Sequence, residues 1–285
     1  MIDLTLRRRF FAEEIEALAN VSTPGLVEAV ASVPREQFLG EGPWLVISEA
    51  DAMMGPRRTP DADAGRVYHN YGIAIDESRQ LFNGVPALLV GWIDKLGLRP
   101  GAKVLHIGTG YGYYTALIGR TVGPTGSVVA IEIDPDLAAR AAKNLEVYPW
   151  VDVRTTGAQG PFNEAFDAIL VNAGVTHPED AWLDGLVPGG RIIIPLTASM
   201  PQMGRIGKGL SLYFTKDADD SFTARRLGPV AIYSAIGLRD DNRNQRLGQA
   251  FMRNPFPAIK RLRRDRHEAV QSCWLHEETF CFSLE

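Results

Sequence analysis

The chain has 285 residues, a length that predicts one large domain or one domain with an appended segment. Hydrophobic residues make up 45% of the chain and charged residues 22%, which is typical of a globular protein and excludes collagen-like, disordered and disulfide-rich classes. Lysine and arginine number 30 against 34 acidic residues, so the net charge of −4 argues against a protein that binds nucleic acid mainly through phosphates.

The amino-terminal sequence and the cysteines both favour a cytoplasmic protein. Residues 1–9 carry charges where a secretory signal needs an apolar core, and no run of about 18 apolar residues follows to span a membrane. Cys273 and Cys281 are the only cysteines, and two suit a reducing compartment but are too few for a disulfide framework or a metal cage. We therefore expect no membrane segment and no metal site.

The first 80 residues predict two helices and then a long loop. Apolar residues at helical spacing over residues 6–20 predict the first helix, and residues 25–33, bounded by prolines, predict the second. Residues 40–80 are rich in glycine, proline, aspartate and arginine. Such a stretch is either a disordered insertion or a lid that closes over a site.

Strands alternate with helices from residue 85 onwards. The predicted strands are 103–107, 127–131, 151–154, 166–171 and 191–195, and the predicted helices are 86–96, 113–120, 134–147 and 182–187, with a turn at 188–190. Several of the strands are continuous apolar runs, which indicates a parallel sheet buried on both faces. The sequence therefore predicts an α/β, Rossmann-like fold with a central, mostly parallel sheet and helices on both faces.

The pattern loosens after residue 195. Residues 210–215, 230–236 and 279–284 predict antiparallel strands, and the basic run 260–267 is interpreted as the solvated face of a helix. The expected organisation is an amino-terminal region of helices and lid loop over residues 1–80, a catalytic core over 81–238, and a carboxyl-terminal extension over 239–285.

A glycine-rich loop after the first core strand is the most informative feature. Gly108, Gly110 and Gly112 lie between a predicted strand and a predicted helix, where the chain turns sharply and lets a ligand approach the backbone. The spacing is G-x-G-x-G, not the G-x-G-x-x-G of dinucleotide sites. Glu132 follows the second strand, where a carboxylate can accept both hydroxyls of a ribose. Together these features favour a site for S-adenosylmethionine (SAM) over one for NAD.

Residues 104–114 resemble the first motif, V-L-E-I-G-T-G-S-G-Y, of the protein-L-isoaspartate (D-aspartate) O-methyltransferases. Other stretches match that family in the same order: Val33–Phe38 (VPREQF), Leu96–Gly101 (LGLRPG), Phe166–Val171 (FDAILV), Gly189–Pro195 (GGRIIIP) and Phe222–Gly237. The resemblance covers about residues 1–238 and implies a SAM-dependent methyltransferase fold and transfer of a methyl group to a carboxylate of a protein or peptide. Nothing in the family pattern explains the extension.

The chain departs from the family pattern at three places. His106 stands where the family has an acidic residue that helps to hold the ammonium end of the cofactor, and the alternative is a buried strand histidine. The family's T-I-S-x-P serine falls on Gly84, so the hydroxyl beside the acceptor is missing; Asn83 either replaces it as a hydrogen-bond donor or is a helix N-cap. The family's G-D-G adenine motif falls on Gly157-Ala158-Gln159.

Two sets of site residues follow from the motifs and the resemblance. The expected catalytic positions are Asn83 and Gly84. The expected cofactor-binding residues are His106, Gly108, Thr109, Gly110, Tyr111, Gly112, Glu132, Ile133, Gly157, Ala158, Gln159 and Asn172. Asn172 is included because it follows the fourth strand at its carboxyl end, where ligands bind in such sheets.

Methyl transfer from a sulfonium to a carboxylate requires mainly positioning and exclusion of water, because the acceptor is already an anion. We expect Tyr68, Asn70 and Asp76 of the lid loop to recognise the acceptor. His177 is either a base for a hydroxyl acceptor or an exposed loop histidine.

Three alternative functions stay open. They are O-methylation of a small molecule or peptide natural product, methylation of an RNA base, which only the basic run supports, and SAM binding without repair activity.

Overall fold

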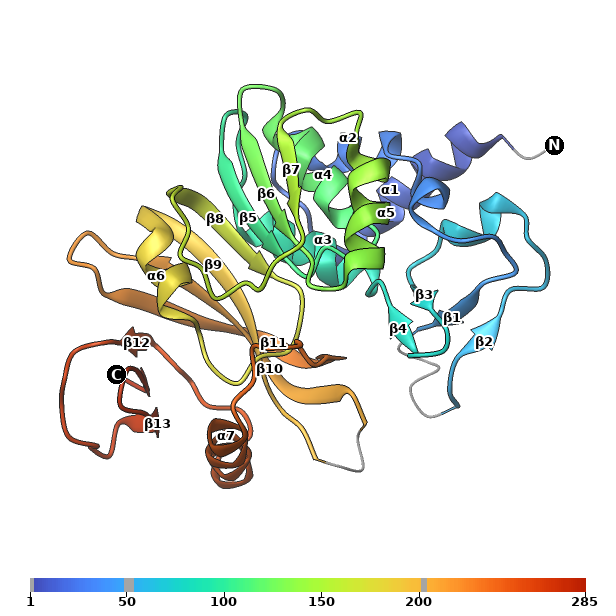
Figure 1. Ribbon diagram of the computed structural model, residues 1–285. Helices are drawn as coiled ribbons and strands as arrows, with labels where there is room; N and C mark the ends of the chain where they lie inside the picture. Colours follow the sequence, from blue (N-terminus) through green and yellow to red (C-terminus); the bar gives the residue numbers. More distant parts are fainter. Residues whose placement is uncertain (1–2, 49–53, 201–203) are drawn as a thin grey trace. The chain divides into compact units, whose positions relative to one another are not determined.

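The computed structural model describes residues 3–48, 54–200 and 204–285, and the chain divides into two compact units (Figure 1). The first unit is Met1–Lys103 with Thr109–Thr156, and the second is Val104–Gly108 with Gly157–Glu285. Residues 49–53 of the expected lid loop lie outside the described residues. Within the described ranges, no helix is both long enough and apolar enough to cross a membrane.

The first unit contains the amino-terminal helices and the helices beside the glycine loop. They are α1 (Leu4–Ala19), α2 (Leu26–Ser32), α3 (Pro86–Lys95), α4 (Tyr113–Val122) and α5 (Pro135–Leu145), with 3-10 turns η1 (Arg35–Phe38) and η3 (Ala64–Val67). The Asp3 carboxylate accepts backbone N–H groups at the start of α1, and Asp134 does the same for α5. These caps explain why α1 begins at Leu4, two residues before the predicted start, and why α5 begins at Pro135, within one residue of it.

The stretch predicted as a loop over residues 40–80 contains a small antiparallel sheet, so that prediction was wrong in part. Its strands pair in the order β2-β1-β3-β4. They are β1 (Leu45–Ile47), β2 (Arg57–Arg58), β3 (Gly72–Asp76) and β4 (Leu81–Phe82). Most of these strands have two or three residues, which is too short for an alternating pattern to stand out.

The parallel core strands confirm the predicted α/β class. In the first unit, β6 (Ser127–Ile131) pairs with β7 (Val151–Arg154) in parallel. In the second unit, β8 (Phe166–Val171) pairs in parallel with both β5 (Lys103–Ile107) and β9 (Leu186–Ala198). The observed bounds of β5, β6, β7 and β8 are the predicted ranges, and β5, β6 and β8 are mostly apolar runs that are buried along most of their length.

The predicted turn at residues 188–190 is part of a long irregular strand. Helix α6 (Asp180–Gly185) ends before Leu186, so residues 186–187 are strand and the predicted helix end was wrong. Leu186 pairs with Phe166, whereas Arg191 pairs with Ala168, so the residues between form a bulge in β9. Gly189 has a φ of 78°, which only glycine adopts readily. The Pro-Gly-Gly signal therefore marks a bulge instead of a break.

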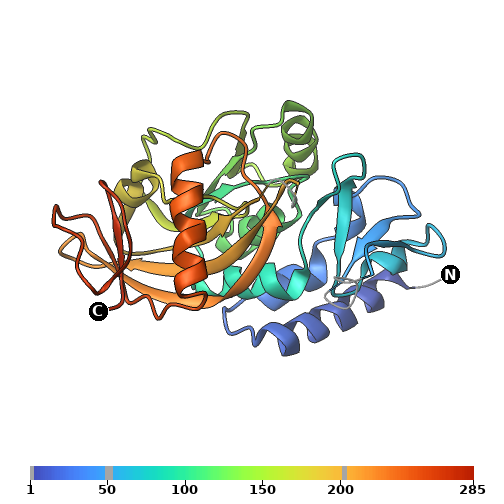
Figure 2. The same cartoon turned by 90° about the horizontal axis from the view of Figure 1, so that it is seen from below.

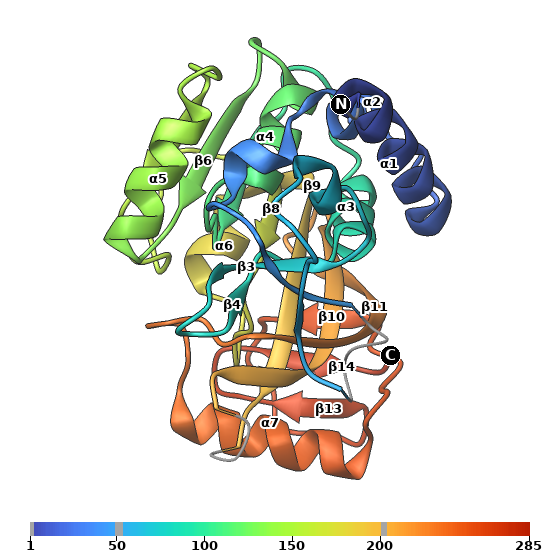
Figure 3. The ribbon, with the colours of Figure 1, turned by 90° about the vertical axis from the view of Figure 1, so that its right-hand side faces the viewer.

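Antiparallel strands continue the sheet of the second unit in the order β9-β10-β11-β12-β14-β13. They are β10 (Ile206–Lys216), β11 (Phe222–Tyr233), β12 (Arg261–Arg263), β13 (Cys273–His276) and β14 (Cys281–Ser283). Helix α7 (Asp241–Arg253) lies across this part of the unit, against β9 and β13 (Figures 2 and 3). The sequence did not predict α7, because its buried residues, Leu247 and Ala250, are too few to give an apolar stripe.

The basic run 260–267 is not a helix face, so that interpretation was wrong. It forms β12 and the loop that follows. Arg264 contacts Asp180 and Asp184 of α6 at 3.1 and 2.7 Å, and Arg263 contacts Asp265 at 2.6 Å. These arginines are therefore paired within the chain.

Candidate functional site

Glu132 fixes the glycine loop of the first unit. One carboxylate oxygen accepts the Gly110 N–H at 2.8 Å and the other accepts the Asp134 N–H at 3.1 Å. The side chain lies at the end of β6 and is 8% exposed. Burial raises the pKa of Glu132, and the hydrogen bonds from Gly110 and Asp134 oppose that shift because they stabilise the ionised form. Its remaining lone pairs can accept hydroxyl groups.

Two glycines of the loop adopt conformations that other residues avoid. Gly110 has a φ of 57° and Gly112 a φ of 96°. A Cβ at Gly110 would lie 3.1 Å from the Ile75 side chain, and one at Gly112 would lie 2.9 Å from that of Leu145. Gly112 is also the N-cap of α4, so the loop ends at the electropositive start of that helix. The geometry explains why the pattern needs glycine at these positions.

The other predicted residues of this loop have distinct environments. Thr109 is buried, and its hydroxyl donates to the Ile131 carbonyl. The Arg140 guanidinium lies 4.4 Å from the centre of the Tyr111 ring. Ile133 is 39% exposed, directly after the buried Glu132. An exposed apolar side chain beside a buried carboxylate is a suitable surface for a nucleoside, whose base is apolar on its faces and whose ribose is polar.

Arg79 joins the small sheet to this region, a contact that the sequence did not reveal. Its guanidinium contacts Asp76 and Asp134, each at 2.5 Å. Asp134 also caps α5, so Arg79 links the β3–β4 hairpin to the helix that follows Glu132. Asp76, which was expected to recognise the acceptor, is therefore paired with Arg79.

Asn83 and Gly84 lie between β4 and α3. The Asn83 side-chain oxygen accepts the Ile73 N–H at 2.9 Å, whereas its amide nitrogen is buried and has no hydrogen-bond partner among the described residues. Gly84 has a φ of 90°, and a Cβ there would lie 2.9 Å from the Leu89 side chain. The Gly84 carbonyl accepts a hydrogen bond from the Tyr114 hydroxyl, a contact that the sequence did not predict.

The alternative that Asn83 caps α3 is wrong. Val85 is the N-cap residue and makes no side-chain cap. The side-chain oxygen of Asn70 accepts the Ala87 N–H at 2.8 Å instead, so Asn70 stabilises the first turn of α3. Tyr68, the third residue expected at the acceptor, donates its hydroxyl to Glu36. Asn70 and Tyr68 therefore have structural partners inside the first unit.

His106 belongs to the second unit, where it lies in β5 opposite Leu170. The side chain is fully buried, and burial lowers its pKa to about 3. The imidazole is neutral near pH 7, so it does not supply the negative charge that the family's acidic residue would place here.

The ends of β5 and β8 approach closely in the second unit. Gly108 has a φ of 83°, and a Cβ there would lie 2.9 Å from the Asn172 carbonyl oxygen. Asn172 donates its backbone N–H to the Ile107 carbonyl at 2.8 Å and its side-chain amide to the Gly108 carbonyl at 3.4 Å. Glycine is required here by backbone proximity, a role that the sequence could not separate from ligand binding.

Residues 157–159, matched to the adenine motif, also lie in the second unit. Ala158 is buried, and its carbonyl accepts the Trp182 indole N–H at 2.6 Å. The Gln159 side-chain amide donates to the Gly237 carbonyl at 2.5 Å. Gln159 therefore has a partner within the fold, close to the start of the extension.

His177 is not an exposed loop histidine, so that alternative was wrong. Its side chain is 12% exposed and lies between the Thr176 hydroxyl, 2.8 Å from Nδ1, and Glu179, 3.2 Å from Nε2. Both ring nitrogens therefore have partners within the same loop.

Comparison with known proteins agrees with this fold. A family model for protein-L-isoaspartate (D-aspartate) O-methyltransferase matches residues 61–232. The enzyme of that name from Methanothermobacter thermautotrophicus is 27% identical over 234 residues, which cover 81% of this chain and 95% of that protein. The enzyme of the same name from Methanothrix thermoacetophila is 30% identical, and the alignment covers 78% of that protein.

Solved structures show the same fold. The alignment with one protein-L-isoaspartate O-methyltransferase structure covers 87% of this chain and 69% of that protein's chain. The TM-score is 0.64 and the sequence identity is 23%. A Plasmodium falciparum structure, described as the same enzyme in complex with S-adenosyl-L-homocysteine, gives a TM-score of 0.59 at 16% identity, over 80% of this chain and 97% of that one.

The match to the family model and to curated relatives, together with this α/β fold, shows a SAM-dependent O-methyltransferase. The chain belongs to the protein-L-isoaspartate (D-aspartate) O-methyltransferase family. Its α7 and β12–β14 follow the matched residues in the sequence.

Proposed function

We propose that the chain transfers the methyl group of SAM to a carboxylate of a protein or peptide, with isoaspartyl residues as the first acceptor to test. The observation that carries this proposal is the buried Glu132 carboxylate, oriented by the Gly110 and Asp134 N–H groups and followed by the exposed Ile133. Glu132 accepts the ribose hydroxyls, and Ile133 provides an apolar surface for the adenine. The cofactor supplies a sulfonium-bound methyl group, which is electrophilic.

The acceptor needs no base, because a carboxylate is ionised near neutral pH. The protein has to orient it and exclude water. Asn83 suits this role, because its buried amide nitrogen has no partner among the described residues, and leaving such a donor unsatisfied costs about 1–3 kcal/mol. An acceptor oxygen that binds Asn83 removes this cost. The remaining predicted cofactor residues, His106, Gly108, Asn172 and residues 157–159, are proposed as contacts on the evidence of their motifs.

Gly84 favours a second candidate function. The family's serine hydroxyl is absent, and the φ of 90° makes this position unsuited to any residue with a side chain. The acceptor contact is therefore made differently here, which suits a carboxylate other than isoaspartate, on a peptide natural product or a small molecule.

The test is transfer of labelled methyl from SAM to an isoaspartyl peptide and to the matching aspartyl peptide. Carboxyl methyl esters release methanol in mild base, whereas methyl ethers and N-methyl groups do not. We expect base-labile label on the isoaspartyl peptide with the wild-type chain. Transfer by Asn83→Ala should be about 10–100-fold slower, because this variant loses one hydrogen bond to a charged group. Asn242→Ala, on the exposed face of α7, is the control and should be unchanged.

Base-stable label would contradict carboxylate methylation altogether. Base-labile label on another acceptor, with none on the isoaspartyl peptide, would support the second candidate and exclude repair.

A further inference from the structure

The extension brings together two histidines and two cysteines that the methyl-transfer reaction does not use. His267, Cys273, His276 and Cys281 each offer a ligand atom, and these four atoms lie within 4.8 Å of one another. All four residues follow the family match in the sequence. We infer that this cluster, with spacing H-x5-C-x2-H-x4-C, binds one zinc ion as a structural site. The inference is independent of the proposed function.

A β-bulge places the ligands on one face of the β13–β14 hairpin. Residues three apart in a regular strand point to opposite faces, so Cys273 and His276 would diverge. Cys273 pairs with Ser283 and His276 with Cys281, with a shift in register before Leu275. Cys281 and Ser283 are two apart and share a face, and cross-strand partners point the same way. The bulge therefore turns both β13 ligands towards Cys281.

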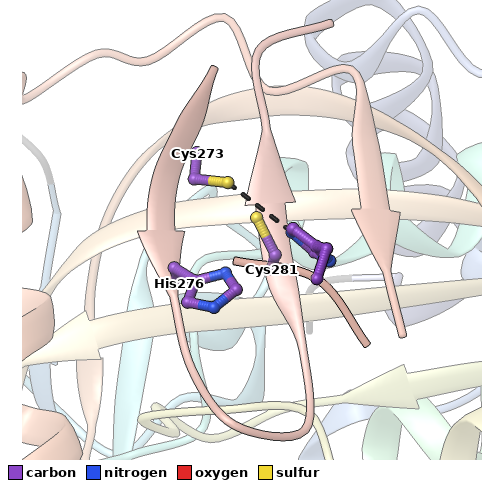
Figure 4. A group of neighbouring side chains, drawn as sticks. Cys273, His276 and Cys281 are labelled. Carbon is purple, nitrogen blue, oxygen red and sulfur yellow. Dashed lines mark hydrogen bonds between the residues drawn. The ribbon is translucent and has the colours of Figure 1, made fainter. Parts of the chain in front are cut away.

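Figure 4 shows the result. The sulfur atoms of Cys273 and Cys281 point into the space between the strands, and the ring of His276 lies on the same side. The Cys273 Sγ is 3.6 Å from the His267 Nε2, a separation suited to two ligands of one zinc ion, since Zn–S and Zn–N bonds of about 2.3 and 2.0 Å give about 3.5 Å in a tetrahedron. The other separations need to close by about 1.5 Å at most, which side-chain rotation provides.

The environment of each ligand suits metal binding. His267 Nδ1 is 2.8 Å from the Asp265 carbonyl and 3.4 Å from its carboxylate, an arrangement that keeps the proton on Nδ1 and the lone pair on Nε2, facing Cys273. The His276 Nδ1 is buried and has no hydrogen-bond partner among the described residues. Cys281 is fully buried. A buried imidazole nitrogen without a partner is explained if it ligates an ion.

The charges are also favourable. The Val270 N–H donates to the Cys273 Sγ at 3.5 Å, a contact that a thiolate accepts more strongly than a thiol. Two thiolates and two neutral imidazoles balance the charge of Zn²⁺, and both thiol protons pass to solvent on binding. This ligand set is the one that zinc prefers in closed, four-coordinate structural sites.

The hairpin is anchored on its other side by α7. The Glu277 carboxylate contacts Arg246 at 2.5 Å, and the Trp274 ring packs against Phe251 with centroids 5.1 Å apart. Zinc would therefore fasten the loop after β12, which carries His267, to a hairpin already attached to α7. The ion replaces hydrophobic core that such short strands cannot supply.

The experiment measures zinc bound to the full chain, purified under reducing conditions with zinc present and then dialysed. We expect about one zinc per chain, and less than about one fifth of that in His267→Ala, Cys273→Ser and His276→Ala. His69→Ala is the matched control, because His69 is an exposed histidine of the first unit. A chelator should lower the Tm of the wild-type chain and of the His69→Ala control. It should leave the Tm of the three variants of the cluster unchanged.

Cobalt substitution of the wild-type chain tests the geometry without a variant. Tetrahedral Co²⁺ with thiolate ligands absorbs strongly in the visible region, and we expect this spectrum, displaced by added zinc. The inference is overturned if the reduced wild-type chain retains no zinc and gives no such cobalt spectrum. It is also overturned if an intact mass two hydrogens lighter shows that Cys273 and Cys281 form a disulfide in the zinc-supplied protein.

Discussion

His106 shows how one substitution changes the chemistry of a buried strand end. The fold keeps this imidazole neutral, because burial lowers its pKa to about 3 from an ordinary value of 6.5. Below pH 6.5 the unfolded chain binds a proton that the folded chain does not bind, so stability present above pH 6.5 is lost as the pH falls towards 3.

We therefore expect His106 to steepen the acid branch of the stability curve. Between pH 6.5 and 4, the free energy of unfolding should fall by up to about 1.4 kcal/mol per pH unit through this residue alone. His106→Leu should show a shallower slope in urea titrations over that range. Equal slopes for the two proteins would mean that His106 is protonated in the folded state.

Gly84 supports a second prediction at this scale. Because its φ is 90° and a Cβ would meet Leu89, Gly84→Ser should lower the free energy of unfolding by about 1–3 kcal/mol. Gly84→Ala is the control for the hydroxyl and should cost a similar amount. Unchanged stability of the serine variant in thermal unfolding would contradict this prediction and show that the position accepts the family's residue.

Helix α3 illustrates a contact that joins distant segments. Asn70, near the end of the stretch predicted as a loop, caps its first turn through the Ala87 N–H. Asn70→Ala should therefore cost about 1 kcal/mol, whereas Asn70→Asp, which keeps the acceptor oxygen, should cost less. Chemical denaturation measures both. If the two variants lose equal stability, or neither loses any, the oxygen does not cap the helix.

Prediction from sequence succeeded for elements with a strong periodic or apolar signal. The strands β5, β6 and β8 are mostly apolar, mostly buried runs bounded by turns, and their limits agree with the expectation, as do those of the less buried β7. The small sheet, the bulge in β9 and helix α7 were missed, because their strands are short or their apolar faces narrow. Whether such elements form depends on pairing between segments that are distant in the sequence, and the local residue pattern does not show that pairing.

The candidate site was predictable to a similar extent. Glycine spacing indicated the sharp turn that the structure shows at Gly110 and Gly112, and Glu132 accepts a hydrogen bond from this loop. The binding of a nucleoside by this loop stays a prediction. The contacts of Arg79 with Asp134, Asn70 with Ala87 and Tyr114 with Gly84 were missed, since each joins residues far apart in the sequence. The proximity of His267, Cys273, His276 and Cys281 was not predicted, because only the cysteines were counted; the two histidines interleaved with them, at H-x5-C-x2-H-x4-C, were the available signal.

At the scale of the whole molecule, the chain continues beyond the residues that the family model matches, and residues 239–285 form a carboxyl-terminal segment with α7 and β12–β14. Arg239 attaches the start of that segment to the rest of the second unit, with hydrogen bonds of 3.0 Å to the Gly174 carbonyl and 2.9 Å to that of Thr197. The strands β12, β14 and β13 then extend the sheet. We propose that residues 239–285 are a distinct addition to the catalytic core, as the sequence division predicted.

Every proposed reaction of this chain depends on SAM held through Glu132, so calorimetric titration with S-adenosylhomocysteine tests the account most directly. At pH 7.5 we expect one site in the wild-type chain, and binding about 10–100-fold weaker in Glu132→Gln, the loss of a charged hydrogen bond to the ribose. Glu146→Gln, at the carboxyl end of α5, is the control and should bind like the wild type. Because burial raises the pKa of Glu132, wild-type affinity should weaken as the pH falls, at a higher pH than an exposed glutamate would give. Equal affinity of the wild-type and Glu132→Gln proteins, or no binding by the wild type, would contradict the account.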